Sequence, residues 1–523
     1  MFETLAVGRA ELKRLGRKVV RKRGRQVLLI AAGERVFAIA NRCPHEGYPL
    51  SEGTLGPGCG LTCDWHNWKF DLATGEARVG RDPARVYPVR LRGDAIEIDL
   101  ADPPAERLRE RALAGLDAAM ADNDRTRMAR ETARLERAGF DARAALVHAI
   151  GATAERLEGG LTHAHAAAAD WLELAERAGA PDLRLAALLE PLGHLADDVL
   201  GAGRFPYPSG AAPWDEAAFA AAMEAEDERA AQALVQGALD AGLGYADLRP
   251  ALGAAALAHY ADFGHSAIYV VKAGQLIERL GEAAVAPVLR ALVRQQVCAR
   301  REDRLPRFRG YAGALAAWTG AGRARASADD FAGQSVTQAL RCAVAASGRP
   351  PRELYDALVG AAAWNMLHFD LTFDRAAGPN IDDAVNWLDF THTLTFANAA
   401  RRLCEAQPEL WPRALLQLAL FVGRNKPYVA ADQDVSEWTV GDAEAFVAGE
   451  MDRLYDHGVA EPIVACHRIK VLFALEDELA AAPDAPWKDV ACAAVNRYLN
   501  TPMKRHHGVR LARQAQAFVG KEG

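Results

Sequence analysis

Two short cysteine–histidine pairs constrain this chain more than any other feature of its sequence. The first reads Cys43-Pro44-His45 and the second Cys63-Asp64-Trp65-His66, with seventeen residues between them. Each pair combines a thiol with an imidazole, and both groups are strong transition-metal ligands. The intervening segment is rich in glycine, which allows tight turns and close backbone approach. The pattern therefore predicts two loop tips that hold one metal centre between them.

Two thiolates and two imidazoles are the ligands of one kind of [2Fe-2S] cluster, in which the cysteines hold one iron and the histidines the other. The predicted ligands are Cys43, His45, Cys63 and His66. Together with Trp68-Lys69-Phe70-Asp71 and the turn at Thr74-Gly75-Glu76, they resemble the Rieske ferredoxin family. The resemblance implies a small all-β domain whose cluster histidines face solvent and form the electron portal.

A Cys2His2 zinc site is the competing interpretation of the four ligands. Zinc fingers usually pair Cys with Cys and His with His, whereas here each arm carries one of each. The Rieske proteins that oxidise quinols carry an additional cysteine in each loop, and these two cysteines form a disulfide. Tyr48 and Trp65 occupy the corresponding places here, so the resemblance is to the ferredoxin or oxygenase type.

The composition of the chain changes after Asp102-Pro103-Pro104. Before this point, residues 26–31, 35–40, 69–72, 86–91 and 95–100 have the pattern of short strands. After it, the chain is rich in Ala, Leu, Arg and Glu with helical spacing. We expect a Rieske domain at 1–102 and an all-α domain at 103–523 that binds metal and carries the catalytic function. The start lacks the pattern of a signal peptide, which predicts a cytoplasmic protein.

The N-terminal domain is basic, largely through a run of Lys and Arg between Arg9 and Arg25, whereas the rest of the chain is acidic. Nucleic acid is one possible partner for such a run. Strand-like segments around it favour the solvated edge of a small sheet, which suits the docking of an acidic electron donor or of the acidic helical part. We therefore expect no nucleic acid as partner. The sequence contains no run of eighteen uncharged apolar residues, so we expect no membrane either.

The helical part contains four similar segments. In each, a histidine lies sixteen residues before a helix breaker, and a second apolar helix follows. These histidines are His163, His265, His392 and His467. The segments predict about four helix-hairpin repeats, although the spacing between them is too irregular for a strict solenoid.

Each segment also has an upstream histidine, and two segments have an aspartate three residues before the main histidine. Repeated hairpins around an axis bring equivalent side chains to a common centre. Two imidazoles and a carboxylate commonly hold non-haem iron. The candidate ligands of a second metal site are therefore His148, His163, His259, His265, Asp262, His368, His392, Asp389, His457 and His467, with His165, His194, Asp197 and Asp198 as extra candidates in the first segment.

Two observations limit the comparison with known enzymes. Rieske oxygenase large subunits also carry a second, catalytic iron domain, but its Asp/Glu-x-x-His-x4-His-like motif does not occur here in order, because Phe396-Ala397 follow Asp389 and His392 where the second His should be. The Ala-rich, His-repeating part instead resembles the questin-oxidase-like proteins, a family that implies oxygen insertion into aromatic polyketides. The chain has no Gly-x-Gly-x-x-Gly stretch after a strand, so we expect a separate reductase or ferredoxin as electron donor.

The leading hypothesis is an oxygenase or oxidoreductase in which a [2Fe-2S] cluster passes electrons to non-haem iron in the helical domain. Its substrate is a small organic molecule, with Trp364, Trp387 and Phe369 as candidate pocket walls. The histidines could instead serve only as helix caps or satisfied core residues. In that case the protein is an electron carrier or redox sensor whose helical repeats bind a partner without a second metal.

Overall fold

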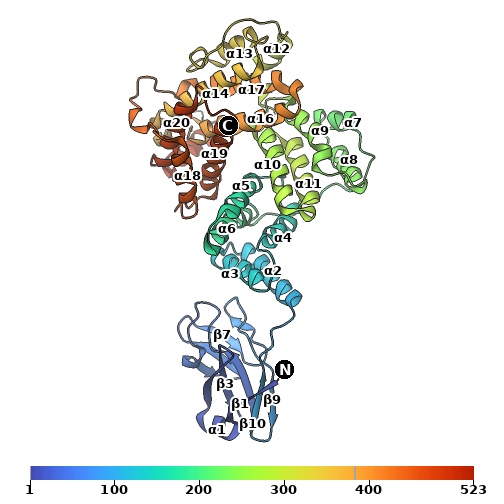
Figure 1. Ribbon diagram of the computed structural model, residues 1–523, viewed down its shortest axis with the longest axis vertical. Coiled ribbons are helices and arrows are strands. Elements are labelled where there is room, and N and C mark those ends of the chain that lie inside the picture. The colour runs from blue at the N-terminus through green and yellow to red at the C-terminus, as the bar shows by residue number, and fades with distance from the viewer. Residues whose placement is uncertain (1, 382–383, 523) are drawn as a thin grey trace. The chain divides into compact units, whose positions relative to one another are not determined.

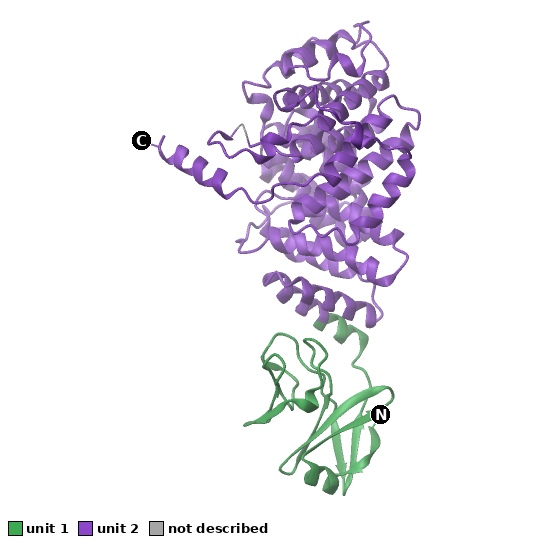
Figure 2. Ribbon diagram, turned by 90° about the vertical axis from the view of Figure 1, so that its left-hand side faces the viewer, with its two compact units in different colours: residues 1–111 green, residues 112–523 purple. Residues whose placement is uncertain are grey.

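A computed structural model describes residues 2–381 and 384–522. It divides into two compact units, residues 1–111 and 112–523 (Figure 2). The first contains a set of antiparallel strands and the second is helical (Figure 1). The small β domain followed by a large helical region is therefore confirmed, whereas the repeats within the helical region remain a prediction.

The smaller unit consists of three antiparallel sheets with the strand orders β1-β10-β9, β2-β3-β4 and β5-β6-β7-β8. The strands are β1 (Phe2–Gly8), β2 (Arg17–Lys22), β3 (Arg25–Ala32), β4 (Arg35–Ala40), β5 (Thr54–Gly56), β6 (Gly60–Cys63), β7 (Trp68–Asp71), β8 (Ala77–Val79), β9 (Val89–Arg92) and β10 (Ala95–Asp99). The expected strand at 86–91 begins three residues later, at Val89.

Strand β3 lies between two hydrophobic cores. Leu28 and Ile30 belong to one core and Val27 and Leu29 to the other, because successive side chains of a strand point to opposite faces. All four side chains are fully buried. The first core also contains the two loop cysteines, so the β2-β3-β4 sheet provides a rigid floor for the predicted cluster loops.

Part of the basic run is helical rather than strand-like. Helix α1 (Arg9–Leu15) precedes β2 and buries Leu12. Gly16 ends the helix with φ of 73°, a conformation that glycine adopts without steric cost. Helix-forming residues between Gly8 and Gly16 explain why the first part of the basic run forms a helix instead of the expected sheet edge.

The larger unit is helical from α2 to α21. Its helices are α2 (Ala105–Ala121), α3 (Arg125–Arg137), α4 (Arg143–Thr153), α5 (His163–Arg177), α6 (Pro181–Asp198), α7 (Glu216–Glu224), α8 (Glu228–Asp240), α9 (Tyr245–Ala258), α10 (His265–Leu280), α11 (Glu282–Cys298), α12 (Gly310–Ala316), α13 (Val336–Ala345), α14 (Pro351–Leu367), α15 (Leu371–Arg375), α16 (Leu388–Ala406), α17 (Trp411–Asn425), α18 (Ala443–Leu454), α19 (Pro462–Ala481), α20 (Lys488–Asn500) and α21 (Gly508–Val519). Within residues 2–381 and 384–522, none of the helices has both the length and the apolar character needed to cross a bilayer.

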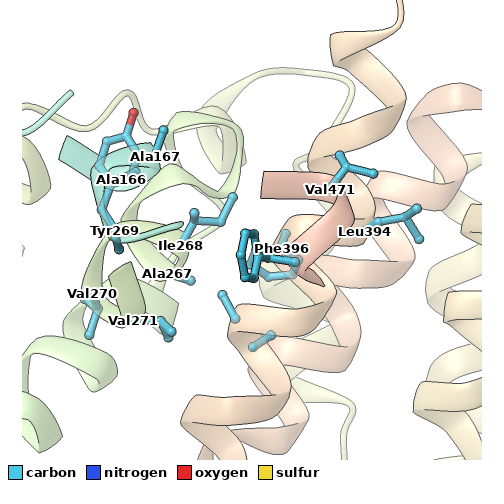
Figure 3. Packing of buried hydrophobic residues seen from close by; sticks show 14 of the residues in the cluster. Ala166, Ala167, Ala267, Ile268, Tyr269, Val270, Val271, Leu394, Phe396 and Val471 are labelled. Atoms are coloured by element: carbon cyan, nitrogen blue, oxygen red, sulfur yellow. The ribbon is translucent and has the colours of Figure 1, made fainter. Parts of the chain in front are cut away.

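Four helices form the centre of this unit. Helix α10 packs against α5 and α16, and α19 completes the ring by packing against the same two helices. Buried alanines on α5, such as Ala166 and Ala167, allow neighbouring helices to approach closely, and Ile268 and Phe396 fill the core between α10 and α16 (Figure 3). Helices that are buried on several sides need small or apolar residues around most of their circumference. Each of the four is followed by a second helix: α6, α11, α17 and α20.

The core of the four-helix ring also contains buried charges. Lys272 Nζ lies 2.6 Å from Asp170 Oδ1, and Lys470 is 1% exposed. Lys470 Nζ has no hydrogen-bond partner among the described residues, and burial lowers the pKa of this amine. Two lysines therefore share an interior that contains one closely paired carboxylate.

Replacing Asp170 by Asn should lower the free energy of unfolding by about 3 to 5 kcal/mol, because it leaves Lys272 buried without its carboxylate. Urea unfolding at pH 7 measures the loss. The matched control is Glu353→Gln, which removes an exposed partner of Arg349 at 2.6 Å and should cost less than about 1 kcal/mol. Equal losses in the two variants would contradict the structural role of the buried pair.

Candidate metal centres

The two cysteine loops of the smaller unit have the same local shape. The Gly47 N–H donates to the Cys43 carbonyl at 2.8 Å, and the Asn67 N–H donates to the Cys63 carbonyl at 2.9 Å. Both donors are in the left-handed region, with φ of 78° at Gly47 and 59° at Asn67. Each turn folds the chain back four residues after its cysteine. As a result, each loop carries a cysteine and a histidine on one tight turn.

The side chains in these loops fit a cluster with mixed ligands. Cys43 and Cys63 are 3% and 1% exposed, and the rings of His45 and His66 have centroids 4.6 Å apart. His45 Nδ1 is buried and lacks a hydrogen-bond partner within the described chain, as expected of an atom that binds a metal. Burial raises the pKa of the Cys43 thiol to about 11, against the opposing effect of nearby backbone N–H groups. A bound cation would stabilise the thiolate and so offset the unfavourable effect of burial on its charge.

Aromatic contacts hold the two loops together. The ring of Tyr48 stacks on Trp65 with centroids 4.0 Å apart and an interplanar angle of 15°. His45 stacks on Trp68 at 4.7 Å, and Gly80 lies so close to Trp68 that an added Cβ would be 2.4 Å from the indole. Tyr48 and Trp65 thus bridge the loops where the quinol-oxidising type would have a disulfide.

The helical unit brings four histidines together at the centre of its four-helix ring. His163, His265, His392 and His467 come from the N-terminal parts of α5, α10, α16 and α19. Their Nε2 atoms follow one another at 3.0 Å from His163 to His265, 2.9 Å to His392 and 3.2 Å to His467. Ligand atoms of His163, His392 and His467 all lie within 4.8 Å of one another. We call these four residues the histidine cluster.

Hydrogen bonds on the other ring nitrogen orient two of these imidazoles, and a carboxylate faces that nitrogen in a third. His392 Nδ1 lies 2.5 Å from the Leu388 carbonyl, and His467 Nδ1 lies 2.7 Å from the Ile463 carbonyl. His265 Nδ1 faces the Asp262 carboxylate at 3.5 Å. Carbonyl and carboxylate oxygens only accept hydrogen bonds, so Nδ1 carries the hydrogen in each ring. The Nε2 atoms that face the centre are therefore unprotonated, and each presents a lone pair.

These lone pairs point at one another at short range. Protonation does not relieve the repulsion easily, because burial lowers the pKa of His392 and His467 well below the usual value of 6.5. A cation at the centre would turn the repulsion into attraction. Imidazoles that bind a metal commonly donate their other N–H to a carboxylate or carbonyl, as these three do.

The spacing of the nitrogens indicates the coordination geometry. With metal–nitrogen distances of about 2.1 Å, neighbouring ligands are roughly 3.4 Å apart in a tetrahedron and roughly 3.0 Å apart at right angles. The observed 3.0, 2.9 and 3.2 Å match the right-angle value. Four nitrogens at these distances are close enough to bind one metal ion together.

His265 follows a rare backbone turn. Asp262, Phe263 and Gly264 have φ of 42°, 56° and 77°, which is the left-handed region for three residues in a row. Only Gly264 adopts it freely, and a Cβ there would lie 2.8 Å from Phe396. Non-glycine residues held in such conformations concentrate at functional sites.

The two aspartates that precede the main histidines support the histidine cluster from outside. Asp262 touches the Nδ1 side of His265, away from the centre. Asp389 accepts a hydrogen bond from the Asn386 N–H and lies 3.5 Å from Arg424, whose guanidinium covers the Phe263 ring at 3.9 Å. Phe263 in turn packs edge-on against His392. The structure therefore does not bring either carboxylate to the centre as a ligand.

The four upstream histidines do not reach the histidine cluster. They lie on helices α4, α9, α14 and α18 or just after them, outside the central ring, and each has its own partner. The contacts are His148 Nε2 to Asp117 at 2.7 Å, His259 Nε2 to Glu224 at 2.5 Å, His368 stacked on Trp364 at 4.2 Å, and His457 Nε2 to Glu190 at 3.5 Å. The prediction that these four histidines are ligands is wrong. Their neighbours in sequence are similar, but they lie on helices that pack outside the central ring.

A cavity of about 850 Å³ opens onto the histidine cluster. His163 and His265 line it and are partly exposed, whereas His392 and His467 are 4% and 0% exposed. Its size suits a small organic ligand. Besides the extra candidates His194 and Asp198, its lining includes residues that the sequence did not single out: Tyr269, Gln295, Arg156 and Arg300. The Tyr269 hydroxyl lies 3.2 Å from His163 Nδ1, one helical turn after His265.

The aromatic residues expected as pocket walls lie elsewhere. Trp387 and Phe369 are fully buried, with ring centroids 5.2 Å apart, and pack in the helical core. Trp364 stacks on His368. None of the three lines the cavity described above. Large aromatic residues are as typical of a hydrophobic core as of a pocket wall, and the sequence does not distinguish the two.

Comparison with known proteins identifies the smaller unit. Residues 4–90 match the family model of the Rieske [2Fe-2S] domain. The 3-phenylpropionate/cinnamic acid dioxygenase ferredoxin subunit of Escherichia coli (strain K12) is 36% identical over 78 residues, which cover 14% of this chain and 74% of the ferredoxin. The chain therefore belongs to the Rieske [2Fe-2S] family, and its N-terminal domain binds a [2Fe-2S] cluster.

Two further relatives match the chain over a similar share. The 4beta-methylsterol monooxygenase of Methylococcus capsulatus is 37% identical over 99 residues, which are 16% of this chain and 26% of that protein, so this chain spans about a quarter of its length. The ferredoxin of carbazole 1,9a-dioxygenase from Nocardioides aromaticivorans IC177 has 27% identity over 16% of this chain and 83% of that chain, with a TM-score of 0.15. The names of the dioxygenase ferredoxin subunit and the monooxygenase link this kind of domain to oxygenase electron transfer. The resemblance of the helical part to questin-oxidase-like proteins stays a prediction.

The buried imidazole of His194 should make stability depend on pH. Burial lowers the pKa of His194 from 6.5 to about 4. Between pH 6.5 and pH 4, His194 therefore binds a proton in the unfolded chain but not in the folded chain. The free energy of unfolding decreases as the pH falls through this range. Between pH 7 and pH 5 the loss from this residue is about 2 kcal/mol. Urea unfolding of metal-free protein at pH 7 and pH 5 measures the drop in the free energy of unfolding. This drop should be about 2 kcal/mol smaller in His194→Gln than in the unaltered protein. An identical pH dependence in both proteins would contradict the neutral buried imidazole.

Proposed function

We propose that this protein is a Rieske-dependent metal oxidoreductase, in which the N-terminal cluster supplies electrons and the histidine cluster holds a redox-active metal ion. The observation that carries the proposal is the convergence of Nε2 lone pairs from α10, α16 and α19, with Nδ1 hydrogens donated outward. Neutral imidazoles arranged in this way have no better partner than a cation.

In this proposal Cys43, His45, Cys63 and His66 hold the [2Fe-2S] cluster. The support is the buried thiols and the unpartnered His45 Nδ1, together with the matching turns of the two loops. The relatives include a ferredoxin subunit of a dioxygenase, which favours a separate reductase or ferredoxin as electron donor. His45 and His66 are partly exposed and would form the entry point for electrons.

The second metal is non-haem iron in this proposal, and such iron commonly supplies oxygen activation when reduced. The protein contributes four neutral ligands, the partly exposed edge at His163 and His265, and a cavity that suits a small organic substrate. His392 and His467 are closed off from solvent, so access to the metal is from one side.

A second candidate function is electron transfer or redox sensing with a helical partner-binding scaffold. One observation favours it: α21 exposes Val509, Leu511, Phe518 and Val519, an apolar group that a partner protein could cover. This function requires no metal in the histidine cluster, so metal content separates the two candidates.

Metal analysis of the purified protein should find a third metal ion per chain in addition to the two irons of the Rieske cluster. His265→Ala and His392→Ala should each lose this ion while the cluster absorption stays unchanged. The matched control is His148→Ala, which removes a histidine bound to Asp117 outside the central ring and should keep all the metal. A protein that holds only two irons under reconstitution, or variants that lose none, would support the scaffold function instead.

Cys43→Ser should remove the visible absorption of the Rieske cluster, because a buried hydroxyl is a much poorer ligand for iron than a thiolate. The matched control is Cys59→Ser, which changes a cysteine near the loops but outside the ligand pattern and should leave the spectrum as it is. An unchanged spectrum in Cys43→Ser would contradict the ligand assignment.

A further inference from the structure

The histidine cluster supplies no negative charge to a metal ion. Four neutral imidazoles leave the charge of a divalent ion uncompensated, which is unfavourable in a low-dielectric interior. Two of the nearby carboxylates are already paired. Asp262 lies 3.5 Å from Arg300 and accepts from Gln295 at 3.0 Å, and Asp170 is bound to Lys272. The interior around the histidine cluster is therefore short of negative charge.

Lys470 increases this shortage. It lies one helical turn after His467 on α19 and is buried. Burial lowers the pKa of His163, His392 and His467, and the positive charge of Lys470 lowers it further. An anion that enters the cavity and binds the metal would be favoured by both positive groups.

The cavity also contains a group that can accept a proton. Asp198 lines it and is 23% exposed at the side chain. Its Oδ2 accepts a hydrogen bond from the Thr162 hydroxyl at 2.6 Å, and its Oδ1 lies 3.8 Å from His194 Nε2. Thr162 directly precedes His163, so the carboxylate is held at the side of the cavity near the histidine cluster.

Burial inverts the usual order of proton affinity in this pair. Burial raises the pKa of Asp198 to about 6 and lowers that of His194 to about 4. Asp198 therefore takes up a proton before His194 does, close to neutral pH, where a proton acceptor is most effective. The charge of Asp197, on the same helix, adds to the rise in the pKa of Asp198. The charge of Asp198 in turn helps to raise the pKa of Tyr269 on α10 and of Cys466 on α19.

We propose that the cavity takes an organic acid with an ionisable hydroxyl, such as an enol or a hydroxamic acid, which binds the metal as its oxyanion after its proton passes to Asp198. The O–H bond of the ligand breaks, a new O–H bond forms on the Asp198 carboxylate, and no electron is transferred in this step. The inference rests on the proposed metal in the histidine cluster and adds the chemical class of its ligand.

Cobalt(II) bound to the full-length protein provides a direct readout, because its visible bands change when its ligands change. Titration at pH 7 with three probes tests the selectivity. Azide is an anion that needs no proton acceptor, acetohydroxamic acid must lose a proton to bind, and acetamide is the neutral control. We expect azide and acetohydroxamic acid to shift the cobalt bands at concentrations at least about tenfold lower than acetamide does.

Asp198→Asn separates the two parts of the inference. The variant keeps the side-chain shape and an oxygen that accepts the hydrogen bond from Thr162, but it removes the group that takes up the proton. Acetohydroxamic acid should therefore bind about tenfold more weakly or worse, whereas azide binding should change less than about twofold. Asp198→Glu restores a carboxylate and should recover part of the lost affinity. The matched control is Asp182→Asn, which alters an exposed aspartate in the first turn of α6 that does not line the cavity and should behave like the unaltered protein.

Two results would overturn the inference. Acetamide binding as well as azide would remove the selectivity for anions, and equal effects of Asp198→Asn on azide and acetohydroxamic acid would remove its role as proton acceptor. Failure of the proposed function gives a different result, since cobalt would then not bind, or its binding would not depend on His392.

Discussion

The repulsion between unprotonated imidazole nitrogens is the constraint on which the helical unit depends. Three helices aim Nε2 lone pairs at one point at distances of 2.9 to 3.2 Å, and hydrogen bonds at Nδ1 prevent the rings from turning away. The ring of α5, α10, α16 and α19 must therefore be rigid enough to hold this arrangement. Close packing of small side chains on α5 and of Ile268 against Phe396 provides that rigidity.

Several unusual features of the unit serve the same centre. The left-handed turn at 262–264 directs His265 inward, and Phe263, which lies within it, packs against His392. Arg424 covers Phe263 and is held by Asp389 and Glu302 at 3.5 and 3.4 Å. Arg424 thus restrains His392 through the ring of Phe263. The Asp-Phe-x-His pattern supports the rings of the histidine cluster rather than adding oxygen ligands to them.

The sequence predicted the features that depend on local spacing. The Cys43 to His66 pattern identified the cluster loops because each ligand pair lies on a single turn. Histidines sixteen residues before a helix breaker share a position at the start of a helix, so four similar helices around an axis bring them together. The upstream histidines have similar neighbours in sequence, but their helices pack outside the ring, and single-sequence patterns do not contain that information. Tyr269 and the cavity were missed for the same reason, since they depend on which helix faces are adjacent.

The wide separation of the clustered histidines along the chain affects how the protein is made. His163 and His467 are about three hundred residues apart, with one contributing helix near the start of the unit and another near its end. At about 5 to 20 residues per second, the ribosome needs roughly 15 to 60 s to add that length. During this interval α5, α10 and α16 are added in turn while α19 is still missing, whereas residues 1–102 have already been made. The Rieske domain can therefore acquire its cluster while the chain is still growing, whereas the histidine cluster is complete only after α19 has been made.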